Sequence, residues 1–234
     1  EEAGLFLDMG MGKTVVSLTA AEELLHDYFA VKKVLVVAPL RPAKETWPTE
    51  AKKWDHLRDL RFSLILGSRT DRERALAADA DIYITNRENV VWLVQELQNA
   101  WPFDMVILDE LSSFKSSKAQ RFRALKRVRK RIARIVGLTG TPAPNGLLDL
   151  WPEMYLLDQG KSLGRTVTGY RDMFFLPDKR NATTIFSWKP KPGAEEEIFD
   201  LIKPVCVSMK AADYLQLPER LIVDREVTLS EKAM

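Results

Sequence analysis

Two glycines, a lysine and a threonine follow a short apolar run near the start of the sequence, in the stretch LFLDMGMGKTVVSL. Gly10 and Gly12 permit positive φ angles, so consecutive backbone N–H groups, including that of Met11, can surround an anion. The helix expected to begin near Lys13 adds unpaired N–H groups and the positive end of its dipole. Lys13 can reach the β- and γ-phosphates of a nucleotide, and the Thr14 hydroxyl can bind its magnesium ion. This glycine loop therefore indicates a cradle for a nucleoside triphosphate.

The match of the glycine loop to the full phosphate-loop pattern is partial. That pattern has a glycine five positions before Gly12, whereas this sequence has Leu7 there. A plain glycine turn between a strand and a helix is therefore the alternative interpretation. The choice between the two depends on whether other residues suited to nucleotide chemistry share the fold.

An acidic pair, Asp109 and Glu110, directly follows the apolar run Met105–Leu108. At the end of a buried strand beside a phosphate loop, Asp109 is placed to hold magnesium through its water shell, and Glu110 to polarise the attacking water. Alone, the pair could equally cap a surface loop. Together with the glycine loop, it favours a nucleotide site in which Lys13, Asp109 and Glu110 carry the catalysis.

Short apolar runs alternate with segments of helical periodicity along most of the chain. Val34–Ala38, which reads VLVVA, is typical of a strand covered on both faces of a parallel sheet. Further strands are expected at Arg61–Leu66, Asp81–Thr85, Met105–Leu108 and Ile135–Leu138, and helices at Val15–Tyr28, Glu45–Trp54, Asp71–Ala78, Val90–Leu97 and Leu147–Leu157. This alternation predicts an α/β fold, with a doubly wound, mainly parallel sheet whose binding loops gather at the carboxyl ends of the strands.

The length of 234 residues suits one large domain, or one domain with an extension. The content of 46% hydrophobic and 29% charged residues is typical of a soluble protein. The single cysteine, Cys206, excludes an internal disulfide framework, and neither His26 nor His56 has the neighbours of a metal site. No apolar run has the length of a membrane span and no signal peptide follows Glu1, so we expect a cytoplasmic protein.

The net charge of +2 conceals an uneven distribution, because no acidic residue occurs from Leu111 to Leu148. Within that stretch, residues Lys115–Arg134 are expected to form one strongly basic helix with an apolar side that includes Phe122 and Leu125. Such a basic face is either simply solvated or a contact for a phosphate backbone. The sequence leaves both interpretations open.

Taken together, these residues resemble the first RecA-like lobe of a superfamily 2 helicase-type ATPase, and most of all the Swi/Snf branch of double-stranded DNA translocases. Five blocks carry the resemblance over about residues 1–160, in the family's order. They are Asp8–Thr14 (motif I), Val36–Pro39 with Trp47 and Trp54 (motif Ia and the helix after it), Ile84–Asn86 (motif Ib), Leu108–Glu110 (motif II) and Leu138–Pro142 with Asn145 (motif III). Both tryptophans are expected in the core.

The resemblance implies a RecA-like P-loop NTPase lobe that binds ATP and Mg²⁺ and belongs to a DNA-dependent ATPase and translocase. It implies that coupling to motif III involves Ser112, Thr139, Gly140 and Thr141. Contacts with double-stranded DNA are expected from residues on the same edge of the sheet, namely Pro39, Arg41, Lys44, Thr85, Asn86 and Arg87. In this family an arginine of the second RecA-like lobe completes the site. That lobe is expected elsewhere in the full-length chain, so the 234 residues alone should be nearly inactive.

Two positions depart from the family's pattern. Motif II usually continues with Ala-His, where this sequence has Leu111 and Ser112, a variant that we associate with phage and prophage members. Ser112 is expected to hydrogen-bond towards motif III in place of the histidine. The adenine-reading glutamine motif would precede Glu1.

Residues 161–234 are expected to form a less regular extension, packed on the lobe and leading to the second lobe. The aromatic residues of this extension favour a small core over a base-stacking surface: Tyr170, Phe174, Phe175, Phe186 and Trp188. A strand that approaches the second lobe is expected at Leu221–Leu229.

Two other functions fit parts of the sequence. A nucleic-acid-binding or interaction module with a vestigial ATP pocket would account for Leu7 and Ser112. A P-loop kinase that acts on a small molecule would account for the glycine loop, but it leaves the threonine turn, Thr139–Pro142, unexplained.

Overall fold

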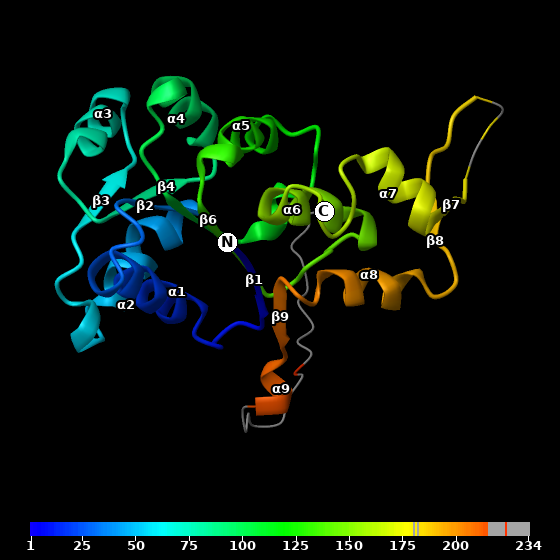
Figure 1. Cartoon of the computed structure of the whole chain (residues 1–234), viewed down its shortest axis with the longest axis horizontal. Coiled ribbons are helices and arrows are strands. Elements are labelled where there is room, and N and C mark those ends of the chain that lie inside the picture. Colours follow the sequence, from blue (N-terminus) through cyan, green and yellow to red (C-terminus); the bar gives the residue numbers. More distant parts are fainter. Residues whose placement is uncertain (180, 182, 215–222, 224–234) are drawn as a thin grey trace, which may run out of the picture.

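A seven-stranded sheet forms the centre of the fold (Figure 1). The computed structural model describes residues 1–179, 181, 183–214 and 223. In spatial order, the strands are β3 (Phe62–Ile65), β4 (Ile82–Asn86), β2 (Val34–Ala38), β5 (Met105–Asp109), β6 (Arg134–Thr139), β1 (Glu2–Leu7) and β9 (Cys206–Met209). Every neighbouring pair of strands runs parallel. The predicted α/β fold with a parallel sheet is therefore confirmed.

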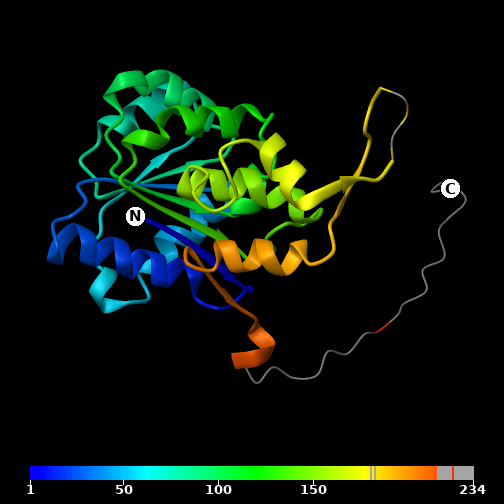
Figure 2. The same ribbon diagram turned by 45° about the vertical axis from the view of Figure 1, so that its right-hand side comes forward.

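Helices cover both faces of this sheet (Figures 1 and 2). One face carries α1 (Lys13–Glu22) and α2 (Trp47–Ala51), and the other carries α3 (Arg69–Ala77), α4 (Val90–Leu97), α5 (Gln120–Val128) and α6 (Leu150–Asp158). Successive residues of β2 enter different cores, because Leu35 and Val37 pack on the side of α4 to α6, while Val34 and Val36 pack on the side of α1 and α2. This two-sided burial is why VLVVA is apolar at every position.

Short turns of π- or 3₁₀-helix extend and connect these elements. The π-helical turns are η1 (Glu23–Asp27), which follows α1, and η2 (Pro42–Thr46), which precedes α2. The 3₁₀ turns are η3 (Asp55–Leu57), η4 (Gln98–Ala100), η5 (Leu111–Phe114), η6 (Arg129–Arg131) and η7 (Leu147–Asp149).

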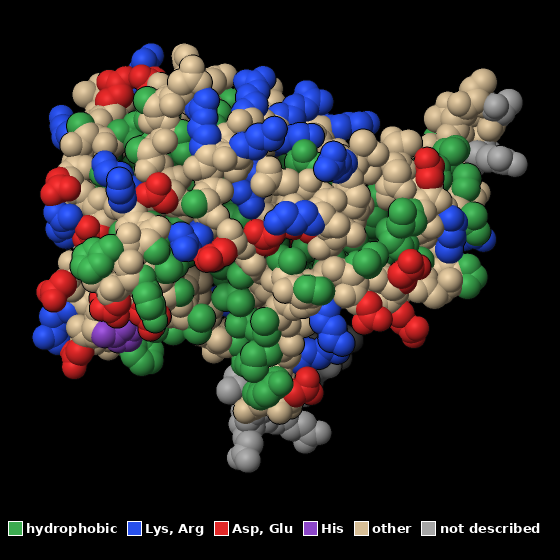
Figure 3. Space-filling view, in the orientation of Figure 1, with side chains coloured by type: hydrophobic (Ala, Val, Ile, Leu, Met, Phe, Trp, Pro, Cys, Tyr) green, Lys and Arg blue, Asp and Glu red, His purple; other side chains and the backbone are tan. Residues whose placement is uncertain are grey.

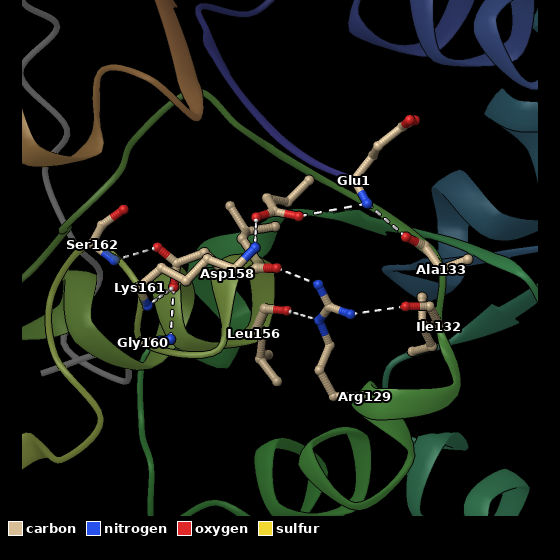
Figure 4. A network of polar contacts seen from close by, with 11 residues as sticks. Glu1, Arg129, Ile132, Ala133, Leu156, Asp158, Gly160, Lys161 and Ser162 are labelled. Atoms are coloured by element: carbon tan, nitrogen blue, oxygen red, sulfur yellow. Dashed lines mark hydrogen bonds and ion pairs between the residues drawn. The ribbon is translucent and has the colours of Figure 1, made fainter.

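The basic segment does not form the single long helix that its sequence predicts. α5 is shorter, and Arg129, the residue after it, is 4% exposed. The Arg129 guanidinium donates hydrogen bonds to the backbone carbonyls of Leu156, Leu157 and Ile132 (Figure 4). Desolvation lowers the pKa of Arg129. This arginine therefore holds the end of α6 instead of facing solvent, while Lys and Arg side chains gather on the surface over α5 (Figure 3).

The chain beyond residue 160 contributes to the central sheet. It forms α7 (Val167–Phe174), an antiparallel ribbon of β7 (Phe175–Pro177) and β8 (Trp188–Pro190), α8 (Ala194–Ile202), β9 and α9 (Ala211–Tyr214). Tyr170, Phe174 and Phe175 are buried and contact one another, whereas Phe186 is exposed. The strand expected at Leu221–Leu229 lies outside the described residues, apart from Val223.

The two tryptophans expected in the core have different environments. Trp47 is fully buried, but Trp54 is 42% exposed, and its indole N–H donates to Glu50 at 3.1 Å. Because α2 ends at Ala51, Trp54 lies in the turn after the helix, and its expected burial is wrong. Among the described residues, no helix has the length and apolar composition needed to cross a membrane.

Candidate nucleotide-binding site

Three adjacent strands bring the glycine loop, the acidic pair and the threonine turn to one edge of the sheet. β6 lies between β5 and β1. Thr139 at the end of β6 pairs with Phe6 of β1, and Asp109 at the end of β5 pairs with Leu138 of β6. Because these strands are parallel, the loops that follow them leave the sheet on the same side. The fold therefore joins three segments that are far apart in the sequence.

The glycine loop has the backbone geometry that its sequence predicts. Gly10 and Gly12 have φ angles of 80° and 75°, in the left-handed region that side chains disfavour. A Cβ at Gly10 would meet no atom within 4 Å, so backbone conformation and not space requires glycine there. Gly12 is the N-cap of α1, and no side chain caps this helix. The N–H groups of its first turn therefore point towards the loop without a side-chain acceptor, as in anion sites.

The Lys13 ammonium lies within the glycine loop. It donates to the backbone carbonyls of Leu7 at 2.6 Å and of Asp8 at 2.9 Å. Gly140 of the threonine turn approaches the same place, since a Cβ there would lie 3.3 Å from the Leu7 carbonyl oxygen and 3.9 Å from Lys13 Nζ. The missing side chain at Gly140 therefore lets the turn after β6 lie against Lys13. Thr14 is half-buried in the first turn of α1.

Asp109, which is partly buried, contacts α2. Its Oδ2 accepts a hydrogen bond from the indole Nε1–H of Trp47 at 2.9 Å. Burial raises the pKa of Asp109, and so does the neighbouring Glu110 carboxylate, while the Trp47 hydrogen bond and the Lys13 charge act in the opposite direction. The Asp109 carboxylate therefore lies within electrostatic reach of both Lys13 and Glu110.

Glu110 adopts a left-handed backbone, with φ 59° and ψ 63°, which is uncommon for a residue with a side chain. Its Oε1 accepts hydrogen bonds from the hydroxyls of Ser112 and Thr139, the latter at 3.3 Å. Thr139 in turn accepts from the backbone N–H of Thr141 at 3.1 Å. The two hydroxyls hold one carboxylate oxygen of Glu110 between η5 and the threonine turn.

The donor set fits a magnesium–nucleotide complex. No cluster of three or more His, Cys, Asp or Glu side chains in the described part of the chain could bind a metal alone. Mg²⁺ usually takes one or two protein oxygens and completes its shell with water and substrate phosphates. The Thr14 hydroxyl and the Asp109 carboxylate are ligands of that kind, and Lys13 with the N-terminus of α1 supplies positive charge for phosphates.

Comparison with known proteins assigns the chain to a family. The SNF2-related domain family matches residues 2–232. The chain belongs to this family. This membership agrees with the Swi/Snf resemblance of the sequence.

Relatives of this SNF2-related domain include a phage protein and eukaryotic helicases. Protein p41 of Acyrthosiphon pisum secondary endosymbiont phage 1 is 38% identical over 239 residues, which cover 100% of this chain and 52% of p41. Helicase ssl-1 of Caenorhabditis elegans is 30% identical over 154 residues, covering 64% of this chain and 6% of the helicase. The SNF2-related domain therefore spans about half the length of p41, and much less of the helicase.

A solved structure has the same fold. The Sulfolobus solfataricus SWI2/SNF2 ATPase core, solved in complex with dsDNA, superposes with a TM-score of 0.69 at 24% identity. The alignment covers 90% of this chain and 40% of that one. The RecA-like architecture expected from the sequence is thereby confirmed.

The SNF2-related domain exposes only some of the residues expected to contact DNA. Arg41 and Lys44 are exposed at η2, beyond the end of β2, and Pro39 is half-buried beside them. Thr85 is fully buried, and its hydroxyl donates to the backbone carbonyl of Ile65 at 3.0 Å. The expected contact of the Thr85 side chain with DNA is therefore not supported, because this residue belongs to a strand that is covered on both faces.

The two residues after Thr85 are paired with the same acid. The Asn86 side-chain amide donates to Glu88 at 3.0 Å, and Arg87 forms an ion pair with Glu88 at 2.9 Å. Arg87 is half-buried, and Asn86 is 9% exposed. Contact with a phosphate backbone would require Arg87 to leave Glu88.

Three features around the site were missed by sequence reasoning. Trp47 was expected only as a core residue, although its N–H contacts the acidic pair. Asp8 Oδ2 accepts the backbone N–H of Ala211 at 2.8 Å, which ties the glycine loop to the start of α9. Glu153 of α6 is 0% exposed, and burial together with the charge of Glu110 raises its pKa. A single acid within the apolar segment LWPEMYLL was the one available signal for Glu153.

Proposed function

We propose that this SNF2-related domain is the ATP-binding lobe of a DNA-dependent ATPase that translocates on double-stranded DNA. The observation that carries the proposal is the meeting of Lys13, Asp109, Glu110 and the threonine turn at the ends of three adjacent strands. Membership of the SNF2-related family and the fold of an ATPase core support it.

In this function, the residues of the site have separate roles. Lys13 and the N–H groups of Gly10, Met11 and Gly12 would bind the phosphates, while Thr14 and Asp109 would hold magnesium. The magnesium ion, when bound, neutralises charge on the phosphates. Glu110 would accept a proton from the attacking water.

Two hydroxyls would support the proton acceptor. Ser112 and Thr139 both donate to Glu110 Oε1 and so restrict the carboxylate to one orientation. The threonine turn, through Gly140 and Thr141, would then couple the state of the bound nucleotide to the conformation of the rest of the protein.

We further propose that turnover needs a second RecA-like lobe of the full-length protein. Coverage of 52% of p41 supports this, because a comparable length of chain would accommodate that lobe. Residues 1–160 would form the ATP-binding lobe, and residues 161–234 would brace it and lead to the second lobe. The bonds of Asp8 to Met209 and Ala211 support this bracing role.

The DNA-binding surface would lie beside η2, where Arg41 and Lys44 are exposed. Pro39 would shape that surface, and Asn86 and Arg87 would join it after releasing Glu88. The similarity to a phage protein supports a place in the cytoplasm of a bacterium or an infected cell.

The test is ATP hydrolysis by the full-length protein with and without duplex DNA. We expect duplex DNA to stimulate turnover, Lys13→Ala to abolish it, and Glu110→Gln to lower kcat by about 10²–10⁴-fold while ATP still binds. The 234-residue chain alone should be nearly inactive. Nucleotide binding without turnover in the full-length protein with DNA would instead favour the interaction module with a vestigial pocket.

A further inference from the structure

A buried indole contacts the acidic pair from a helix that contributes no other group to the nucleotide site. Trp47, the first residue of α2, is 0% exposed, and its Nε1–H donates to Asp109 Oδ2 at 2.9 Å. The two residues are 62 positions apart in the sequence. α2 follows β2, and β2 lies beside β5 in the sheet, so the contact joins two neighbouring strand ends.

The direction of this indole is fixed by its packing. Ala43 and Ala51 lie one helical turn before and after Trp47, and both are buried with it in the core below α1 and α2. Small side chains at these positions let α2 approach the sheet closely. Because the indole is fully buried in this core, close packing restricts the direction of its N–H donor before any ligand binds.

The acceptor distinguishes Trp47 from an ordinary buried tryptophan. A buried indole N–H usually has an acceptor, and any backbone carbonyl would serve. Here the acceptor is a carboxylate at the end of β5, beside Lys13 and Glu110. Trp54, a few residues later, donates instead to Glu50 on the surface and provides a natural comparison.

We propose that Trp47 is a positioning residue that orients the Asp109 carboxylate for the magnesium ion of a bound nucleotide. The inference rests on the proposed function. With Oδ2 bonded to the indole, rotation of the carboxylate is restricted, and Oδ1 is the oxygen turned away from Trp47. Groups of this kind, one step removed from the metal, commonly fix the direction of its ligands.

The test compares variants of the full-length protein by the binding of a fluorescent ADP analogue, mant-ADP, across a Mg²⁺ titration without turnover. Trp47→Phe removes the donor but also ring volume. A second variant therefore carries 3-benzothienylalanine at position 47, which keeps the shape of tryptophan and replaces N–H by sulfur. The same two changes at Trp54 are the matched controls, and Asp109→Asn is the reference for loss of the carboxylate.

We expect both changes at position 47 to raise the Mg²⁺ concentration for half-maximal binding by about tenfold, as for loss of a hydrogen bond to a charged acceptor. Binding of mant-ADP without Mg²⁺ should not change, and the Trp54 variants should match the wild type. The benzothienyl variant removes the hydrogen-bond donor without leaving a cavity. Its Mg²⁺ dependence therefore tests the role of the indole N–H even if Trp47→Phe does not fold.

Two results would overturn the inference. If the benzothienyl variant keeps the wild-type Mg²⁺ dependence while Asp109→Asn loses it, Trp47 is only a core residue and the proposed function stands. If the wild type shows no Mg²⁺-dependent binding, the proposed function fails, and this inference fails with it.

Discussion

Glu153 gives a prediction whose size follows from its burial. This residue of α6 is 0% exposed, and neither carboxyl oxygen has a hydrogen-bond partner among the described residues. Burial, and after it the charges of Asp149 and Glu110, raise the pKa of Glu153 to about 8, while Lys115 acts in the opposite direction. At neutral pH the carboxyl is therefore protonated in the folded protein and ionised in the unfolded chain.

The direction in which the free energy of unfolding changes with pH follows from proton binding. Between the ordinary glutamate pKa of 4.5 and the pKa of about 8 in the folded protein, the folded state binds more protons than the unfolded state, so stability falls as pH rises through this window. Each pH unit within it changes the free energy of unfolding by about 1.4 kcal/mol. From pH 5 to pH 8, Glu153 should thus cost about 4 kcal/mol of stability. Below the window, this cost is absent.

The substitution Glu153→Gln keeps the shape of the side chain and removes its titration. Urea unfolding of the 234-residue chain, followed by circular dichroism at pH 5, 6, 7 and 8, gives the difference in free energy of unfolding between variant and wild type. This difference should grow with pH in favour of the variant by about 4 kcal/mol. The exposed Glu196→Gln of α8 is the matched control for loss of a carboxylate.

A difference that stays constant from pH 5 to pH 8 would contradict the raised pKa of Glu153. It would mean that the carboxylate is ionised in the folded state and has a partner that stabilises its charge. A growing difference for Glu196→Gln of the same size would refute it as well, because the effect would then not depend on burial.

Three further predictions concern folding and binding. Arg129→Ala should lower the free energy of unfolding, measured in urea, by about 3–5 kcal/mol, because the carbonyls at the end of α6 lose a buried charged donor. Lys130→Ala, at the exposed neighbouring residue, should have little effect. Equal effects of the two substitutions would contradict this prediction. Gly12→Ala should cost about 1–2 kcal/mol of stability, since φ is 75° at this residue. It should also weaken ATP binding measured by calorimetry, and unchanged binding would contradict the role of the glycine loop in binding phosphates. Arg41→Ala and Lys44→Ala in the full-length protein should each reduce the salt slope of duplex-DNA binding by about one, and an unchanged slope would exclude η2 from the interface.

The sheet and the site edge were predictable because they depend on local pattern and on a general rule of parallel sheets. The run VLVVA of β2 is apolar at every position, and this pattern is typical of strands that are covered on both faces. Asp109 and the glycine loop each follow an apolar run, so the rule that loops after parallel strands share one edge brought them together without knowledge of strand order.

The remaining features depend on long-range geometry that a single sequence does not encode locally. β9 reads CVSM, and its Val207 is 54% exposed, so neither length nor pattern marks it as the neighbour of β1. Arg129 belongs to a run of basic residues, and it is buried because the end of α6 lies against it and accepts its hydrogen bonds. Thr85 looks like an exposed polar residue at a strand end, yet every residue of β4 is buried, because the strand is covered on both faces of the sheet.

The surroundings of Glu110 explain how Ser112 can occupy the position where the resemblance places a histidine. A histidine would span the gap between the acidic pair and the threonine turn. In this domain β5 and β6 are neighbours, and Thr139 reaches Glu110 directly at 3.3 Å. The left-handed backbone at Glu110, with φ 59°, brings its carboxylate to both hydroxyls. Because serine and threonine do not titrate near neutral pH, this link between the turn and the carboxylate has no imidazole-like dependence on pH.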